Sequence, residues 1–321
     1  MAGRIIIYQV LVLTILAVTG FLGVKFKLIS NEVKEGLAKL VFNITLPLLI
    51  FSKISRLELS LSLLSDSIRY IVLVYVAFLL MYVVAWLSTR LLKLPPRGEQ
   101  VFLAHSMFGN IIFLGFPLMD ALFPGGEGIL FVTLYHLVSS TILWTAGVYL
   151  LNKGHSTSGK EFLKKLFNPN TLAFFTGLVV AAFSLKLPRL FYDTFGKLGD
   201  TTLYLSLLYI GILLSALSPG AVIRRRSTYL LSLNKLLLVP FLMIMVLFLL
   251  AHFFSLYMGE TARSVLILET AMPCMANIVI LAKVFGSDDH LAMENVFLTT
   301  ILSILSLPLI HWLMNLILFN P

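Results

Sequence analysis

The sequence predicts an all-α membrane protein with ten transmembrane helices, and three observations support this fold class. Hydrophobic residues make up 59% of the 321 residues and charged residues only 12%, whereas a soluble domain carries roughly 25% charged residues. The charged residues also leave ten long uncharged runs, and the lysines and arginines gather in alternate loops. This composition excludes a soluble enzyme, a disordered chain and a nucleic-acid-binding domain. The net charge of +9 is therefore expected to face lipid headgroups.

The uncharged runs define the expected helices. A bilayer core about 30 Å thick needs roughly 20 apolar residues in a helix, and eight of the runs reach that length. The two shorter runs reach it when they are extended toward the N-terminus, the second one through Glu269. The ten runs are 5–24, 40–52, 70–89, 100–119, 128–152, 166–185, 201–223, 236–259, 270–282 and 295–321.

The distribution of lysine and arginine predicts the orientation. Fifteen of the 24 lie in loops that follow odd-numbered runs, and eight lie at the N-terminus or after even-numbered runs. Because positive charge is retained in the cytoplasm, we expect a multi-pass plasma-membrane protein with both termini outside and a cytoplasmic linker at 153–168. Lys235 lies next to the eighth run, and we expect it to snorkel to the cytoplasmic interface.

The linker divides the chain into two halves of opposite direction. Five runs lie in residues 1–152 and five in 169–321, and an odd number of helices per half inverts the second half relative to the first. Helix breakers occur in the fourth helix of each half, namely Gly109, Gly115 and Pro117 in the first and Pro273 in the second. Proline and glycine are common in membrane helices, but breakers at corresponding positions of inverted halves indicate a transporter's binding site.

The two breaks are expected at the same depth. At 1.5 Å per residue, Asn110 and Pro273 both lie roughly 20 Å into the membrane, near its midplane. If both helices unwind there and cross, two half-helix N-termini converge, and their unpaired N–H groups and partial positive charges attract a carboxylate without a buried lysine or arginine.

Five motifs, in order along the chain, point to a family. They are VFNITLPLLIFSKIS (41–55), GNIIFLGFPLMDALF (109–123), LGDTTLYLSLLYIGILLSALSP (198–219), AMPCMANIVILAKVFG (271–286) and LSLP (305–308). Together they resemble the auxin efflux carrier family, whose plant branch consists of the PIN-type auxin exporters. Because the long central loop of many plant carriers is missing, the chain is similar to prokaryotic members.

The resemblance implies a fold and a mechanism. Members have two inverted five-helix repeats with crossed, broken helices four and nine, as in bile-acid symporters and sodium/proton antiporters. Helices one, two, six and seven would form a scaffold domain that holds a homodimer, and helices 3–5 and 8–10 would form a transport domain that moves like an elevator. Plant members export an aromatic carboxylate, and prokaryotic members are associated with small organic acids such as malate and malonate.

The resemblance also implies substrate contacts. Asn110 matches the asparagine after the first crossover, and Gly109 stands where plant carriers have proline. Pro273 matches the second crossover proline, and Ser140 matches a position that faces the plant substrate, where plant carriers have glutamine.

The residues after Pro273 also differ from the plant carriers. Cys274 and Met275 replace a Gln-Gly pair, and they could line the pocket through their backbone N–H groups.

Two readings stay open for each polar residue in the spans. Asn110 contacts the ligand or caps a half-helix. Glu269 carries a proton, binds a cation, or supports the crossover as a neutral or paired acid. His105 shuttles protons or is a neutral, hydrogen-bonded histidine. Asn43 faces the substrate or satisfies backbone freed by a following proline, and Asn277 lies at the start of the second half-helix of the ninth helix.

The predicted function is therefore export of a small organic anion by alternating access. The alternative is a sodium- or proton-coupled importer of the same fold, and a channel is a weaker candidate. We expect no cofactor and no metal site, and coupling to H⁺ or Na⁺ stays open.

Overall fold

A computed structural model describes residues 2–30, 32–152, 167–215, 225–254 and 257–319. Within these residues every regular element is a helix, and the one β-type contact is an isolated antiparallel bridge between Gly109 and Cys274. Helical elements fall on each of the ten predicted runs. The fold class predicted from composition is therefore confirmed as all-helical.

The first half begins with α1 (Ala2–Lys25) and continues through an interrupted series of helices. Several long helices change to a π-helical turn of five residues along their length, and these turns are named η. The elements are α2 (Val33–Leu40), η1 (Val41–Thr45), α3 (Leu46–Ile54), α4 (Leu61–Leu92), α5 (Pro96–Met107), η2 (Ile111–Gly115), α6 (Phe116–Leu122), α7 (Glu127–Ile142), η3 (Leu143–Gly147) and α8 (Val148–Leu151).

The second half has a similar series. Its elements are α10 (Pro169–Ala182), α11 (Arg189–Ser215), α13 (Arg226–Leu233), η4 (Asn234–Leu238), α14 (Val239–Phe254), α15 (Glu260–Thr270), α16 (Asn277–Val284), α17 (Asp289–Met314) and η5 (Asn315–Phe319).

Side-chain caps begin three of the helices. The Ser60 hydroxyl accepts a hydrogen bond from the N–H of Leu63 at the start of α4. Asn168 caps α10, whose first residue is a proline, and Asp288 caps α17. Because these side chains satisfy N–H groups that lack helical partners, they determine where the helices start after each loop.

Six helical stretches in the described chain are long and apolar enough to cross a membrane. They are Val33–Ile54, Leu61–Leu92, Glu127–Leu151, Arg189–Ser215, Arg226–Phe254 and Asp289–Leu318. Helices α1 and α10 are apolar in shorter segments, and the fourth and ninth helices are interrupted. A multi-pass membrane protein is thus supported, and the count of ten spans stays a prediction.

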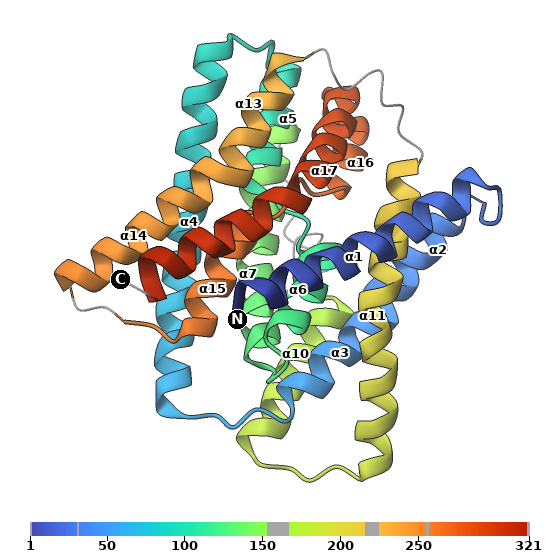
Figure 1. Ribbon diagram of the computed structural model, residues 1–321, viewed down its shortest axis with the longest axis vertical. Helices are drawn as coiled ribbons and strands as arrows, with labels where there is room; N and C mark the ends of the chain where they lie inside the picture. Colours follow the sequence, from blue (N-terminus) through green and yellow to red (C-terminus); the bar gives the residue numbers. More distant parts are fainter. Residues whose placement is uncertain (1, 31, 153–166, 216–224, 255–256, 320–321) are drawn as a thin grey trace.

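The helices pack as two groups (Figure 1). In one group α1 lies along α11, and α3 packs against both α10 and α11. In the other group α15 packs against α7 and α4, and α17 contacts α5, α13 and α16. The groups touch where η2 and α6 meet α11, where α17 and α6 meet α1, and where α7 meets α3.

The boundary between the two groups is not tightly filled. A cavity of about 380 Å³ lies there, lined mostly by apolar side chains of α1, α11, η2, α6 and α17 and also by Lys25. An ion pair also crosses the boundary, because the Nζ of Lys53 on α3 lies 2.8 Å from Oδ1 of Asp120 on α6.

Glycines allow α1 and α11 to approach closely. A Cβ atom built on Gly211 would overlap the carbonyl oxygen of Ala17, and one built on Gly20 would overlap that of Leu208. Small residues at a helix–helix contact bring backbones together and increase van der Waals contact, which is a main source of association energy between membrane helices. This reciprocal contact therefore holds α1 and α11 together.

We expect the Gly211→Val variant to lower the thermal unfolding midpoint of the purified protein, because the new side chain pushes α1 away from α11 at a cost of about 1–3 kcal/mol. The matched control is Gly196→Ala on the same helix, where a Cβ would meet nothing within 4 Å. Equal midpoints for the two variants, measured by intrinsic fluorescence in detergent, would contradict this account of the contact.

Candidate functional site

Two helices are interrupted where the sequence contains its predicted breakers. Helix α5 ends at Met107, and η2 begins at Ile111 after three non-helical residues. Helix α15 ends at Thr270, and α16 begins at Asn277. Pro273 has no N–H group to continue a helix.

The two interruptions hydrogen-bond to each other in an antiparallel arrangement. The N–H of Asn110 donates to the carbonyl of Pro273 at 2.8 Å, and the N–H of Met275 donates to the carbonyl of Phe108 at 3.2 Å. Gly109 is required for this approach, because a Cβ there would lie 2.9 Å from the Cβ of Met272. Each non-helical segment thus satisfies backbone groups of the other, as buried backbone in a membrane protein requires.

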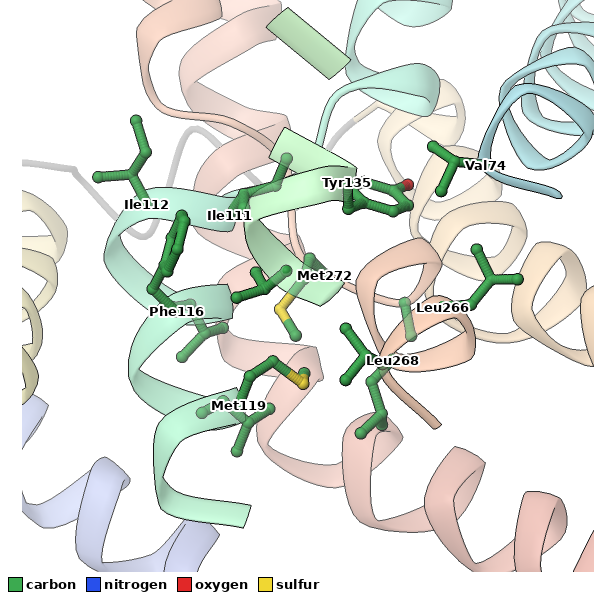
Figure 2. Packing of buried hydrophobic residues seen from close by; sticks show 14 of the residues in the cluster. Val74, Ile111, Ile112, Phe116, Met119, Tyr135, Leu266, Leu268 and Met272 are labelled. Atoms are coloured by element: carbon green, nitrogen blue, oxygen red, sulfur yellow. The ribbon is translucent and has the colours of Figure 1, made fainter. Parts of the chain in front are cut away.

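Apolar packing holds the junction on one side. Figure 2 shows Ile111, Phe116 and Met119 of η2 and α6 in one buried cluster with Leu268 of α15 and with Met272, which follows α15. All five side chains are buried. The positions of the two half-helices are therefore fixed both by backbone hydrogen bonds and by packing.

A small cavity lies where the N-terminal ends of η2 and α16 meet. Its volume is about 20 Å³, which is room for about one water molecule. The described residues that line it include no lysine, arginine, aspartate or glutamate. They are Gly109, Asn110, Ile111, Ile112, Phe113, His136, Ser139, Ser140, Leu143, Met275, Ala276 and Asn277.

Asn110 has the geometry of a cap at the edge of this cavity. Its Oδ1 accepts a hydrogen bond from the N–H of Phe113 at 3.4 Å, so the side chain begins η2. The residue is 4% exposed. The sequence suggests that Asn110 either caps a half-helix or contacts the ligand. The cap is present, and Asn110 is also one of the residues that line the cavity.

Helix α7 supplies the opposite wall, where Ser140 was expected. The hydroxyl of Ser140 lies 3.5 Å from Nε2 of His136, one helical turn away. Ser139 lines the same cavity. Asn277, at the first position of α16, also lines it and is exposed.

Cys274 and Asn43 do not line the cavity. The Cys274 N–H donates to Oγ1 of Thr299 at 3.0 Å, and its side chain is fully buried. The N–H of Met275 is also used within the junction, although Met275 itself lines the cavity. That these two N–H groups meet an anion stays a prediction. Asn43 lies in η1, is exposed, and donates its amide to the carbonyl of Lys39 in its own helix at 2.9 Å.

His105 is a buried bridge between three elements. Its Nε2 lies 3.3 Å from the carbonyl of Met275, and its Nδ1 lies 3.3 Å from the side-chain amide of Asn295 on α17. Because a carbonyl only accepts, Nε2 carries the proton, and Nδ1 accepts from the amide. Both nitrogens of the neutral ring are thereby hydrogen-bonded. This favours a neutral histidine that holds these elements in place over one that shuttles protons.

Glu269 is buried without a hydrogen-bond partner. The side chain is 1% exposed, and neither carboxylate oxygen has a partner among the described residues. It lies against Gly115, where a Cβ would be 2.6 Å from Oε1. The positive charge that acts on this carboxyl group is that of Lys235 in η4.

Sequence reasoning missed several residues of this region. Asn295 and Thr299 lie one turn apart on α17 and hydrogen-bond to His105 and Cys274. Their four-residue spacing in the sequence indicates that two polar side chains share one face of a membrane helix. His136 lines the cavity as well, and the sequence gives it no partner at ligand spacing.

Lys235 was expected to reach the cytoplasmic interface, and this is wrong. It is 1% exposed, and its Nζ donates to the carbonyl of Ser106 at 3.1 Å. The π-helical turn η4, in which it lies, is not visible in the sequence pattern.

Two archaeal proteins align with nearly the whole chain. An uncharacterized transporter of Methanocaldococcus jannaschii is 24% identical over 315 residues, which are 95% of this chain and 97% of that protein. An uncharacterized transporter of Methanothermobacter thermautotrophicus is 26% identical over 301 residues, which are 94% of this chain and 95% of that protein.

The family comparison covers the same extent. Residues 5–311 match the family described as "Membrane transport protein". The chain therefore belongs to the membrane transport protein family, which includes the auxin efflux carriers that its motifs resemble, and it is a transporter rather than an enzyme.

Proposed function

We propose that the protein exports a small organic anion by alternating access and binds it between the N-terminal ends of η2 and α16. The observation that carries this proposal is the convergence of these two ends on one cavity without a lysine, arginine, aspartate or glutamate among the described residues that line it. Each helix N-terminus contributes roughly half a positive charge. Two such ends suit a carboxylate, as at other anion sites.

The topology that we propose places this site near the middle of the membrane. Ten spans would form two inverted halves, 1–152 and 169–321, with outward-facing termini and a cytoplasmic linker in the plasma membrane. Support comes from the interrupted helices, which are the fourth of each half and pair in antiparallel fashion. Inverted halves produce this arrangement because their equivalent segments run in opposite directions.

We further propose an elevator movement between the two groups of helices. The group with α1, α3, α10 and α11 would be the scaffold and would hold a homodimer, and the other group would carry the anion. The unfilled volume of about 380 Å³ between the groups supports such sliding. The 20 Å³ cavity is too small for an organic acid, so the site would have to widen to admit one.

Coupling to protons is proposed through Glu269. A carboxyl group inside a membrane span is costly when charged and unpaired, so a change of its protonation alters the energy of the junction against which it packs. The alternative of a coupled importer uses the same site, and the direction of flux in vesicles separates the two.

The Asn110→Asp variant tests the anion site. Aspartate is as good a helix cap as asparagine, so η2 should keep its start, but a like charge about 4 Å from a carboxylate costs roughly 4 kcal/mol at an effective dielectric constant of 20. We expect more than tenfold weaker binding of organic acids, measured by thermal shift and by currents on solid-supported membranes, with and without sodium.

The matched control is Asn110→Ser, which keeps the cap without adding charge. It should retain binding better than Asn110→Asp. Anion binding by Asn110→Asp at wild-type strength would exclude the proposed site.

The Glu269→Gln variant tests proton coupling. If Glu269 gains and loses a proton during transport, its amide replacement should abolish the pH dependence of flux while a similar shape is retained. Glu260→Gln, an exposed position in the first turn of the same helix, serves as the control and should keep the wild-type pH profile. An unchanged profile in Glu269→Gln would remove this residue from the coupling mechanism.

A further inference from the structure

Lys235 occupies an unusual position for a lysine. It lies in η4, and its Nζ donates to the carbonyl oxygen of Ser106 in the last turn of α5. Lys235 and Glu269 are each 1% exposed, less than any other lysine, arginine, aspartate or glutamate among the described residues. A buried charge is kept only where it is paired or hydrogen-bonded, so this lysine is held for a reason other than solubility.

The interruption explains why the Ser106 carbonyl needs a donor. In a continuous helix this oxygen would accept from the N–H of Asn110 four residues later. That N–H instead donates to the Pro273 carbonyl on the other chain segment. The helix end therefore leaves a buried acceptor, and the ammonium group of Lys235 satisfies it.

Charge adds a second reason. The C-terminal end of a helix carries about half a negative charge and is stabilised by a cation. The positive charge of the ammonium group also acts on the buried carboxyl group of Glu269. One ammonium group thus stabilises both the C-terminal end of α5 and the carboxylate of Glu269, which has no hydrogen-bond partner among the described residues.

We propose that Lys235 is a positioning residue, whose ammonium group replaces the hydrogen bond lost at the break in α5 and balances the charge of Glu269, so that the anion site keeps its geometry. The proposal rests on the proposed function where it concerns the anion. Lys235 is not among the residues lining the cavity. It acts through Ser106, which lies four residues before Asn110.

The first test needs no substrate. It compares the thermal unfolding midpoints of Lys235→Met, Glu269→Gln and the double variant in detergent, with Lys283→Met at an exposed position as the control for charge loss. Because Lys235→Met leaves Glu269 as an uncompensated buried charge, we expect a fall of about 5 °C or more. Adding Glu269→Gln should then recover part of this loss.

Two outcomes decide the charge balance. Strictly additive shifts in the double variant would overturn it, since independent residues add and coupled ones do not. If Lys235→Met gives no folded protein, recovery of folded protein in the double variant supports the proposal. The Lys235→Ala/Glu269→Asp variant keeps the carboxylate without the ammonium group. If this variant is stable while Lys235→Met and the double variant both fail to fold, the proposal is contradicted.

The second test reads the anion site. Malonate and phenylacetate, a small dicarboxylate and an aromatic monocarboxylate, are titrated against wild type, Lys235→Arg and Lys235→Met below their unfolding midpoints. We expect the affinity of Lys235→Arg for these acids to lie within a few-fold of the wild-type affinity. The affinity of Lys235→Met should be at least tenfold weaker. Equal affinities for wild type and Lys235→Met overturn the positioning role. If wild type binds neither acid, the proposed function fails, and the stability test still decides whether Lys235 and Glu269 are coupled.

Discussion

The structure depends on the reciprocal hydrogen bonds between the two interrupted helices. Backbone that leaves the helical conformation inside an apolar layer has no water to bond to, and each unsatisfied group costs several kcal/mol. The bonds from Asn110 to Pro273 and from Met275 to Phe108 remove that cost for both segments together. One break alone would have no such partner, so each half of the chain requires the other.

This pairing creates further needs, which neighbouring helices meet. The bonds that join the two segments take N–H groups away from the last carbonyls of α5. The carbonyl of Ser106 then accepts from Lys235, and that of His105 accepts from the thiol of Cys274 at 3.7 Å. The junction is thus surrounded by polar side chains that satisfy backbone atoms, and only part of the polar content of this region faces the cavity.

Much of the fold could be predicted from composition and residue type. Uncharged runs locate helices because a lipid-facing helix must be apolar, and Gly109 and Pro273 mark the breaks because neither residue supports a continuous helix. Helix ends were less predictable. Helix α11 begins at Arg189, before the run 201–223, since hydropathy detects the apolar part of a helix and polar residues extend it.

The polar side chains of the site were only partly predictable. Asn110, Ser140 and Asn277 are brought to one cavity as expected. Cys274 does not line the cavity, because its neighbour in sequence, Met275, faces it, and in extended backbone adjacent residues point to opposite sides. Lys235 was misjudged because its partner, Ser106, is distant in sequence and presents a backbone carbonyl, which no side-chain motif can reveal.

The hydrogen bonds at the junction also determine what can move in the proposed transport cycle. Because η2 and α16 are tied to each other through their preceding segments, the anion site should move as one unit with α5 and α15. The contacts that must then change are those to the other group, where the rings of Phe113 and Tyr209 lie 4.2 Å apart and Lys53 pairs with Asp120. Besides this aromatic contact and this partly exposed ion pair, which contribute on the order of 1 kcal/mol each, the packing of α17 on α1, of α3 on α7 and of η2 and α6 on α11 would have to change. The backbone hydrogen bonds of the junction can stay intact in such a cycle, because they lie within one group.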